Sequence, residues 1–559
     1  MEKVERKIKL KYTRTGKPNF VFFYDKSWRI TKDLKLFFKS YRFRKGTKTW
    51  AVLASPVNAE NLEYFAKKHD FDISPDALLY CKKLTERMNI LEDMNSWKDA
   101  TLDNDKYNNT LLPYQRVGVR YALEVKRTFI ADDMGLGKSL QAIATTELSG
   151  SYPALIVCPA SLKYNWEREW KKWEPERTVA IWDAEFQDPA EVAIISYAAM
   201  ASIQNKILNS TFKMIVFDEA HYLKTKGRKR TEAAKVIANQ SERVLLLTGT
   251  PVTNKPGDIL APLEVLKRLD FMGGFKHFAT YYCGGRRTRF GWELKGADHL
   301  DELNNNLRRM CYIRREKSEV LPDLPEMRRV VVPMVMDNGS YNISEIDQEF
   351  PDYILEEIIR KASEYYEGTL HLEDNFRESS VTDRVKKNYR SVPIKIKIEE
   401  IEKVKKNILD AKLSAVQEWI TNFLESGEKL IVFGIHREWL IDLADYFNSP
   451  LLIGGMSDKE KEASLDRFRS DPDCKAIFMN IQSGGTGLTL TESSNVVFTE
   501  IAWTPAEHAQ AEARVHRIGQ EATSVTSWYL LAKDSLEERM FKMILGKEQI
   551  SIEATSGEV

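Results

Sequence analysis

Hydrophobic residues gather along this chain in short, uninterrupted runs that amphipathic segments separate. The runs form two series, the first at residues 128–132, 154–159, 192–197, 214–219 and 243–249, the second at residues 430–435, 476–481, 496–501 and 524–532. Continuous apolar runs, unlike alternating ones, are typical of parallel strands that helices cover on both faces. The pattern therefore predicts two successive α/β domains, each built on a parallel sheet.

The segments outside the two series differ in composition. Residues 1–95 are rich in Lys, Arg and aromatic residues, which predicts a small α+β domain. We expect the first α/β lobe in residues 96–335 and the second in residues 411–559. Residues 336–410 are charged and helix-prone, so we predict a helical insertion and linker there.

Charge is distributed unevenly. The first 50 residues hold 16 Lys and Arg against 4 Asp and Glu, a net charge of +12, and because the whole chain carries +1, the other 509 residues carry −11. Such asymmetry indicates an anionic partner for the N-terminal part. The five cysteines lie far apart with no C-x-x-C pair, which argues against a disulfide scaffold or a zinc ribbon. Without a signal peptide or an apolar run of about 20 residues, we expect a soluble intracellular protein with no membrane partner.

A glycine-containing loop joins the first apolar run to a helix in FIADDMGLGKSLQ. Backbone N–H groups at such a helix start bind phosphate, Lys138 supplies a charge for the β- and γ-phosphates, and Ser139 offers a hydroxyl to Mg²⁺. The match to G-x-x-x-x-G-K-[ST] is incomplete because Asp132 occupies the first glycine position. Taken alone, the segment also fits an ordinary turn before a helix.

A pair of acids ends the fourth run, in MIVFDEAH. Ligands bind beyond the carboxyl ends of parallel strands, where Asp218 would hold Mg²⁺ and Glu219 would orient or deprotonate the attacking water. A solvated acidic strand end is the alternative for this motif alone. The two motifs in this order on one sheet favour nucleotide hydrolysis.

A third motif lies far along the chain, in AEHAQAEARVHRIGQ. Gln510, Arg514 and Arg517 follow one another at i, i+4 and i+7, which predicts one face of a helix. Two arginines so close repel each other unless an anion lies between them, and a γ-phosphate is such an anion. Arginine fingers of this kind accelerate hydrolysis by roughly 10³–10⁵. A solvated basic face is the alternative for the motif alone.

These motifs, in this order over residues 108–548, resemble those of the Swi/Snf-type DNA translocases of helicase superfamily two. The resemblance implies two tandem RecA-like parallel-sheet lobes with helical insertions, preceded by the small α+β domain. It implies that Gln115 contacts adenine, that Asp at the first glycine position belongs to the family pattern, and that the nucleotide is bound by Asp133, Met134, Gly135, Leu136, Gly137, Lys138, Ser139 and Gln510. Ala513 departs from the Asp that is frequent before the first finger arginine.

One branch of the family is most similar in motif spacing. The spacing through KSEVLPDLPE and AKLSAVQEWI is similar to the annealing helicases, and residues 28–75 resemble the basic HARP domain that precedes their motor. This implies a monomeric, ATP- and Mg²⁺-dependent DNA translocase that anneals strands or remodels branched DNA and stalled forks. A motor that displaces or slides DNA-bound proteins, a decayed ATPase that serves as a DNA-binding scaffold, and a strand-separating or RNA helicase are the alternatives. We expect a cytoplasmic protein of a prokaryotic or phage-infected cell, or a nuclear one in a eukaryote.

Three groups of residues are candidates for DNA contacts. Lysines and arginines hold backbone phosphates without reading sequence. Aromatic side chains beside them can stack on unpaired bases, worth about 1–3 kcal/mol per base, although a small core under a basic surface is the alternative. The candidates are Lys224, Lys226, Arg228 and Lys229 after DEAH, where a solvated helix start or a localisation signal also fits, Ser483 and Thr486 in the second lobe, and Arg42, Arg44, Lys45, Lys48 and Trp50 near the N-terminus.

Overall fold

The computed structural model describes residues 5–14, 16–249, 256–289, 291–294, 296–336, 352–366, 394–481 and 488–544. These residues form two compact units. Among the described residues, the first unit holds those up to 133 and from 137 to 316, and the second holds residues 134–136 and those from 317 to 544. No helix within the described ranges is long and apolar enough to cross a membrane.

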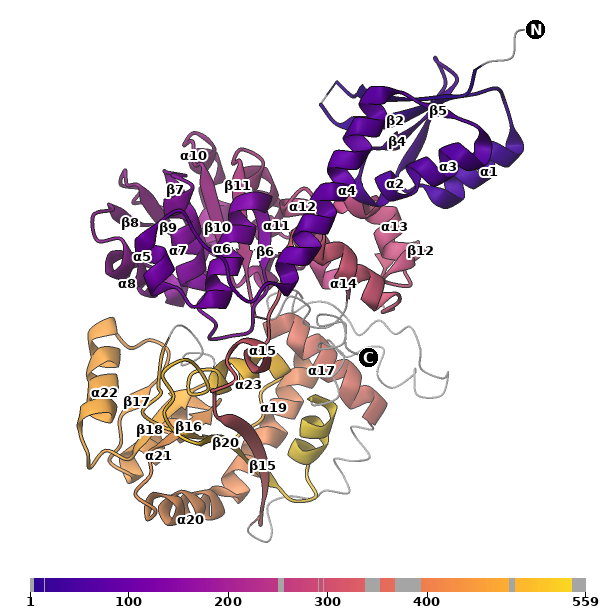
Figure 1. The fold of residues 1–559 in the computed structure, drawn as a ribbon. Coiled ribbons are helices and arrows are strands. Elements are labelled where there is room, and N and C mark those ends of the chain that lie inside the picture. The colour runs from indigo at the N-terminus through magenta and orange to yellow at the C-terminus, as the bar shows by residue number, and fades with distance from the viewer. Residues whose placement is uncertain are drawn as a thin grey trace. The chain divides into compact units, whose positions relative to one another are not determined.

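The first unit begins with a small α+β domain, as predicted (Figure 1). Its five-stranded sheet has the order β3-β4-β2-β1-β5, in which β1 and β5 are parallel and the other pairs antiparallel. Phe22 packs on Phe38 and Phe65, so α1 and α3 cover one face of the sheet. The elements are β1 (Lys7–Tyr12), β2 (Pro18–Phe23), α1 (Trp28–Phe37), β3 (Tyr41–Arg44), β4 (Thr49–Leu53), α2 (Pro56–Glu60), α3 (Leu62–His69) and β5 (Asp72–Ile73).

A parallel seven-stranded sheet forms the rest of the first unit. Its order is β14-β6-β11-β10-β7-β9-β8, and all five predicted strands are present. The elements are α4 (Pro75–Ser96), α5 (Asp105–Thr110), α6 (Pro113–Val125), β6 (Arg127–Ile130), α7 (Lys138–Leu148), β7 (Ala154–Cys158), α8 (Lys163–Trp173), β8 (Val179–Trp182), β9 (Val192–Ser196), α9 (Tyr197–Ser202), α10 (Gln204–Leu208), β10 (Met214–Asp218), α11 (Lys229–Ala238), β11 (Arg243–Leu247), α12 (Leu260–Val265), α13 (Gly274–Tyr281), β12 (Arg286–Thr288), β13 (Gly291–Glu293), α14 (Leu300–Arg308) and β14 (Tyr312–Ile313).

The second unit is built on a six-stranded parallel sheet of order β15-β20-β19-β16-β18-β17. All four strands predicted for this lobe are present. The elements are α15 (Lys317–Val320), β15 (Glu326–Met334), α17 (Asp352–Tyr366), α19 (Ile394–Ala411), α20 (Leu413–Leu424), β16 (Leu430–Gly434), α21 (Arg437–Tyr446), β17 (Leu451–Leu452), α22 (Asp458–Ser470), β18 (Ala476–Asn480), β19 (Asn495–Phe498), α23 (Pro505–Glu512) and β20 (Ser524–Ala532).

The border between the lobes differs from the sequence-based expectation. Strand β15 lies within residues 96–335, which we assigned to the first lobe, yet it pairs along its whole length with β20 of the second sheet. It is an edge strand that begins with charged residues, exposes Glu326, Arg328 and Arg329, and contains Pro333, so its sequence does not resemble that of a strand buried on both faces. Helices α17 and α19 lie in the predicted linker, but Leu355 and Ile401 are buried in the core of the second unit.

Candidate functional site

The glycine-containing loop connects β6 to α7. Gly135 and Gly137 have φ of +86° and +75°, a left-handed backbone that favours glycine, and α7 begins at Lys138. The Lys138 Nζ atom donates to the carbonyl oxygens of Asp132, at 2.8 Å, and Asp133, at 3.0 Å. A Cβ atom on Gly137 would overlap Nε2 of Gln115, so the structure places the expected adenine-reading residue directly against this loop. Ser139 is the second residue of α7, on its first turn.

Asp218 ends β10, two strands away from β6 in the sheet, and three hydrogen bonds hold it, two to its carboxylate and one to its backbone. Trp166 Nε1 donates to Oδ2 at 2.8 Å, the backbone N–H of Glu219 donates to Oδ1 at 3.0 Å, and the hydroxyl of Tyr197 donates to the backbone carbonyl oxygen at 2.8 Å. Burial, and then the charge of Glu219, raise the pKa of the Asp218 carboxyl. A nearby cation would relieve both effects, as expected of a residue that binds Mg²⁺.

Glu219 has a left-handed backbone with φ of +49°, which is unusual for a residue with a side chain. Its Oε2 atom accepts a hydrogen bond from Thr248 Oγ1 at 3.3 Å and lies 3.2 Å from Nδ1 of His221. Thr248 directly follows β11, the strand beside β10, so Thr248 and the DEAH segment meet at one sheet edge. This contact orients the carboxylate and explains the need for a hydroxyl at position 248.

The carboxylates at this edge of the sheet act on the charge of Lys138. Burial lowers the pKa of the Lys138 ammonium, and the carboxylates of Glu219, Asp132, Asp133 and Asp218 oppose that shift. A lysine, two strand-end carboxylates and a glycine cradle therefore lie together at the carboxyl edge of one parallel sheet. This set of donors and acceptors fits a nucleotide triphosphate with Mg²⁺.

Asp132, at the first glycine position of the motif, has a structural partner. Its side chain is 0% exposed and accepts hydrogen bonds from Arg315 Nε at 2.8 Å and from Gln141 Nε2 at 2.9 Å, with Arg315 Nη2 completing a bidentate ion pair. The neighbouring Arg314 pairs with Asp133 at 3.0 Å. The two arginines thus fasten the phosphate-binding loop to the chain that follows β14.

Several residues of this site were not predicted. Trp166 lies in the core, and its role could not be read from the sequence because the indole N–H that holds Asp218 leaves no trace in a hydrophobicity pattern. In the sequence, Arg314 and Arg315 are two adjacent charges after an apolar pair, and this pattern does not indicate which acidic residues they bind. Thr248 could have been found from its position after an apolar run, as Asp218 was.

The arginine motif has a different local structure from the one expected. Helix α23 ends at Glu512, so Arg514 and Arg517 lie in the turns that follow it, and the prediction of one helical face with Gln510 is wrong. The chain leaves the helix where the carbonyl oxygen of Arg514 accepts a hydrogen bond from the N–H of Leu490. Nevertheless, both guanidinium groups reach the carbonyl oxygen of Leu488, from 3.5 Å and 3.0 Å, so the two arginines converge.

The candidate DNA contacts after DEAH differ in accessibility. Lys226 and Lys229 are exposed, Arg228 is half-buried and Lys224 is buried. The Nζ atom of Lys226 lies 2.8 Å from Glu264 and 4.5 Å from the centre of the Phe275 ring. Ser483 and Thr486 lie outside the described residues.

In the N-terminal domain, strand alternation separates the charged candidates from the aromatic ones. Arg42 and Arg44 project from the sheet face that α1 and α3 leave uncovered, whereas Trp50 projects from the opposite face with Tyr41 and Phe43. The uncovered face forms part of a cavity of about 880 Å³, whose lining includes Lys17, Arg42, Arg44, Lys45 and one acid, Asp270. Lys48 lies in the exposed turn between β3 and β4. The basic and aromatic residues that we expected to act together therefore lie on two different surfaces of the domain.

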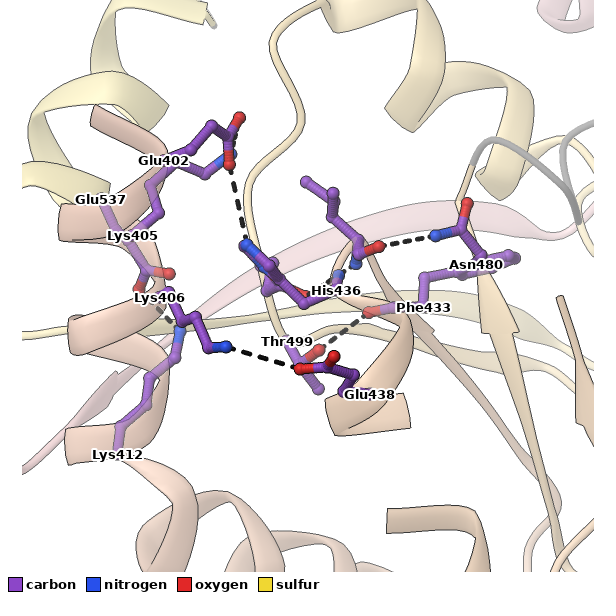
Figure 2. A network of polar contacts seen from close by, with 12 residues as sticks. Glu402, Lys405, Lys406, Lys412, Phe433, His436, Glu438, Asn480, Thr499 and Glu537 are labelled. Atoms are coloured by element: carbon purple, nitrogen blue, oxygen red, sulfur yellow. Dashed lines mark hydrogen bonds and ion pairs between the residues drawn. The ribbon is translucent and has the colours of Figure 1, made fainter. Parts of the chain in front are cut away.

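A half-buried histidine and a buried glutamate form a pair at the carboxyl edge of the second sheet. The ring of His436 bonds to Glu500, whose other oxygen accepts the backbone N–H groups of Ile435 at 2.7 Å and His436 at 3.0 Å. Figure 2 shows the other side of the ring reaching toward Glu402, at 3.8 Å. The hydrogen bond to Glu500 raises the pKa of His436 above its ordinary value although burial opposes it. Burial acts on Glu500 too, but His436 holds the pKa of that carboxyl below its usual range.

This pair predicts that the second unit loses stability as the pH rises. A histidine whose pKa is higher in the folded state contributes its full stability below its unfolded pKa of about 6.5 and loses it as the pH rises through the folded pKa. We expect the free energy of unfolding to fall by about 1–3 kcal/mol across this window. Urea unfolding of the full chain between pH 5.5 and 9, compared with His436→Gln, measures the effect. Equal pH dependence in both proteins would exclude this pair as its source.

Comparisons with known proteins identify the domains and relatives of this chain. Residues 114–371 match the model of the SNF2-related domain, and residues 411–519 match the helicase conserved C-terminal domain. The chain is 31% identical over 476 residues to the Homo sapiens protein named DNA annealing helicase and endonuclease ZRANB3, an alignment that covers 81% of this chain and 41% of that one.

Two further matches are similar in kind. The Xenopus tropicalis SWI/SNF-related matrix-associated actin-dependent regulator of chromatin subfamily A-like protein 1 is 29% identical, over 82% of this chain and 46% of its own length. The chain thus spans less than half the length of these two curated relatives. Among solved structures, the Sulfolobus solfataricus SWI2/SNF2 ATPase core in complex with dsDNA has 22% identity and a TM-score of 0.37, over 78% of this chain and 92% of that one.

Proposed function

The chain belongs to the Swi/Snf-type family of helicase superfamily two, and from this premise we propose that it is a DNA-dependent ATPase that translocates on double-stranded DNA. The observation that carries the proposal is the meeting of Lys138, Asp218 and Glu219 at the carboxyl edge of one parallel sheet. A glycine-containing loop, a glutamate with a strained backbone and a buried lysine in one place are typical of a functional site and are rare around ion pairs that only stabilise the fold. The set fits phosphoryl transfer to water.

Each residue of the site has a distinct role in this proposal. Lys138 would hold the β- and γ-phosphates, and Ser139 and Asp218 would hold Mg²⁺, which would supply positive charge beside the phosphates. Glu219, oriented by Thr248, positions the attacking water and accepts its proton. Arg514 and Arg517 stabilise the negative charge of the transition state, Gln115 contacts the adenine, and Gln510 adds a polar contact to the nucleotide.

We propose further that the motor anneals strands or remodels branched DNA, with the N-terminal domain as the element that binds the branch. The name of the human relative, DNA annealing helicase and endonuclease ZRANB3, supports the annealing activity. The basic sheet face around Arg42, Arg44 and Lys45 supports the second part, because it is both concave and positively charged. A DNA backbone fits such a surface without base-specific contacts.

ATP hydrolysis by the full chain tests the proposal, measured without nucleic acid and with single-stranded, linear duplex and forked DNA and with duplex RNA. We expect the strongest stimulation by forked DNA. Equal stimulation by any DNA duplex would instead support a motor that displaces or slides DNA-bound proteins. Absence of stimulation by all of these would contradict the proposal of a DNA-dependent motor.

The same assay tests the N-terminal domain. Replacing Arg42, Arg44 and Lys45 by Ala should remove the preference for forked over linear DNA while leaving stimulation by linear duplex. A matched control replaces three exposed cations on the opposite, helix-covered side of the domain, Arg29, Lys32 and Lys67. An unchanged fork preference in the first variant, or an equal loss in the control, would remove this role from the basic face.

A further inference from the structure

A short β-hairpin projects from the first unit between α13 and α14. Strands β12 and β13 pair antiparallel, with Arg287 opposite Trp292 and Thr288 opposite Gly291. Arg286, Arg287 and Arg289 are all exposed. Residues 284–294, of which the structure describes all but Phe290, contain these three arginines and one acidic residue, Glu293. Neither the phosphate-binding loop nor the motifs around it use this element.

The base of the hairpin is held tightly. The N–H of Gly285 bonds to the carbonyl oxygen of Ala279 at 2.7 Å, and that of Gly296 to Cys283 at 2.8 Å. A Cβ atom on Gly285 would overlap Ala279, and one on Gly296 would lie 3.0 Å from the carbonyl oxygen of Cys283. Such close backbone packing fixes the direction in which the hairpin projects. The arginines are therefore displayed by an anchored element.

The hairpin adjoins the basic segment that follows DEAH. Trp292 packs edge-on against Phe275 of α13, with ring centres 5.6 Å apart, and the Nζ atom of Lys226 lies 4.5 Å from the same Phe275 ring. Phe275 thus lies between a hairpin residue and a candidate DNA contact. The hairpin and the post-DEAH segment are therefore neighbours on the first unit.

Helix α13 also adjoins the N-terminal domain, at both of its ends. A Cβ atom on Gly274 would lie 3.5 Å from the hydroxyl oxygen of Ser40, and Lys39 Nζ lies 5.2 Å from the ring centre of Tyr281. Lys17 of that domain forms an ion pair with Asp270, just before α13. The N-terminal domain, the hairpin and Lys226 therefore all contact α13 or the residues just before it, and Figure 1 shows β12 and the N-terminal domain beside this helix.

We propose that Arg286, Arg287 and Arg289 form a further DNA-binding site, which holds the phosphate backbone of a duplex between the motor and the N-terminal domain. This inference rests on the proposed function and adds a contact surface to it. Guanidinium groups match phosphate oxygens in geometry and charge, and a duplex presents one negative charge per about 1.7 Å of its axis. Adjacent strand residues project from opposite faces, so the anchored hairpin carries cations on both of its faces, and such an element beside other cations fits a polyanion.

The salt dependence of DNA binding tests the site in the full chain. Each phosphate contact that is lost lowers the slope of log Kobs against log salt by about 1. Replacing the three arginines by Ala should therefore lower the slope by about 2–3 and weaken duplex binding about tenfold or more near physiological salt. DNA-free ATP hydrolysis and the melting temperature should stay unchanged, because the arginines lie outside the nucleotide site.

A matched control removes three exposed lysines from the other side of the same lobe: Lys171 on α8, Lys206 on α10 and Lys213 before β10 (Figure 1). The control should keep the wild-type slope. A wild-type slope in the hairpin variant, or an equal loss in the control, would overturn the site. If the wild-type chain binds DNA and is stimulated by it, such a result refutes the hairpin site alone. If the wild-type chain neither binds DNA nor is stimulated by it, the proposed function itself is refuted.

A photo-crosslinker in place of Thr288, between the arginines, provides a second readout that does not depend on the folding of the triple variant. Crosslinking to a short linear duplex, reduced by added salt, is the expected result. This measurement requires the crosslinker-bearing chain and an unlabelled duplex, without any other protein. Absence of any DNA adduct at a concentration that saturates DNA-stimulated hydrolysis would contradict the site.

Discussion

Glu219→Gln is expected to slow DNA-stimulated ATP hydrolysis by about 10²–10⁴-fold, the usual contribution of a positioned general base. Glutamine retains the size of the side chain and an oxygen that Thr248 can donate to, so the strained backbone and the local packing should persist. What the variant lacks is the negative charge that draws a proton from the attacking water. Phosphate release under single-turnover conditions, together with binding of a labelled ATP analogue and of DNA, measures the effect.

The binding measurements separate loss of chemistry from loss of structure. We expect nucleotide and DNA binding to change little in Glu219→Gln, whereas Lys138→Ala should also weaken nucleotide binding. Glu242→Gln is the matched control, because Glu242 is an exposed acid just before β11, at the opposite edge of the same sheet. Hydrolysis at the wild-type rate in Glu219→Gln would remove Glu219 from the chemical step.

Asp132→Gly restores the missing glycine of the general phosphate-loop pattern, yet we expect it to destabilise the protein by about 3–5 kcal/mol. Removing one partner of a buried ion pair leaves the other charge buried without compensation. Here Arg315 would lose its carboxylate, and Gln141 would lose the acceptor for its Nε2 atom. Urea unfolding at constant pH measures the free energy, and ATP hydrolysis should fall in parallel because the loop loses its attachment.

A double-mutant cycle tests this explanation. Arg315→Met combined with Asp132→Gly should be less destabilising than the sum of the two single changes, since neither charge is then left alone. Asp99→Gly is the control, because Asp99 pairs with Arg116 at the surface, where such pairs contribute about 0–1 kcal/mol. Additive single effects would show that Asp132 acts through something other than its pair with Arg315.

Much of the active site could be read from the chain because its residues lie at the ends of apolar runs. A run that reads as a buried parallel strand places the next polar residue at the carboxyl edge of the sheet, as with Asp218 and Glu219. The loop before Lys138 was recognisable for the same reason, since Gly135 and Gly137 adopt the left-handed backbone its turn requires. These are local relations in which a few adjacent residues determine the geometry.

Contacts between distant segments could not be read in this way. The pairing of Asp132 with Arg315 and the hydrogen bond from Trp166 to Asp218 join residues 183 and 52 positions apart. Their formation depends on which elements pack together. The end of α23 before Arg514 was likewise decided by a hydrogen bond to Leu490, a residue outside the helix.

By itself, therefore, the sequence determined two parallel-sheet lobes, a basic α+β domain and the strand-end carboxylates, because period, charge and glycine positions act over short distances. The tertiary structure alone decided that β15 joins the second sheet and that Arg42 and Trp50 face opposite ways. It also decided that the hairpin of Arg286 and Arg287 adjoins Lys226 through Phe275. An edge strand, a choice of sheet face and a packed aromatic pair each depend on neighbours remote in sequence, and only the folded chain brings those neighbours together.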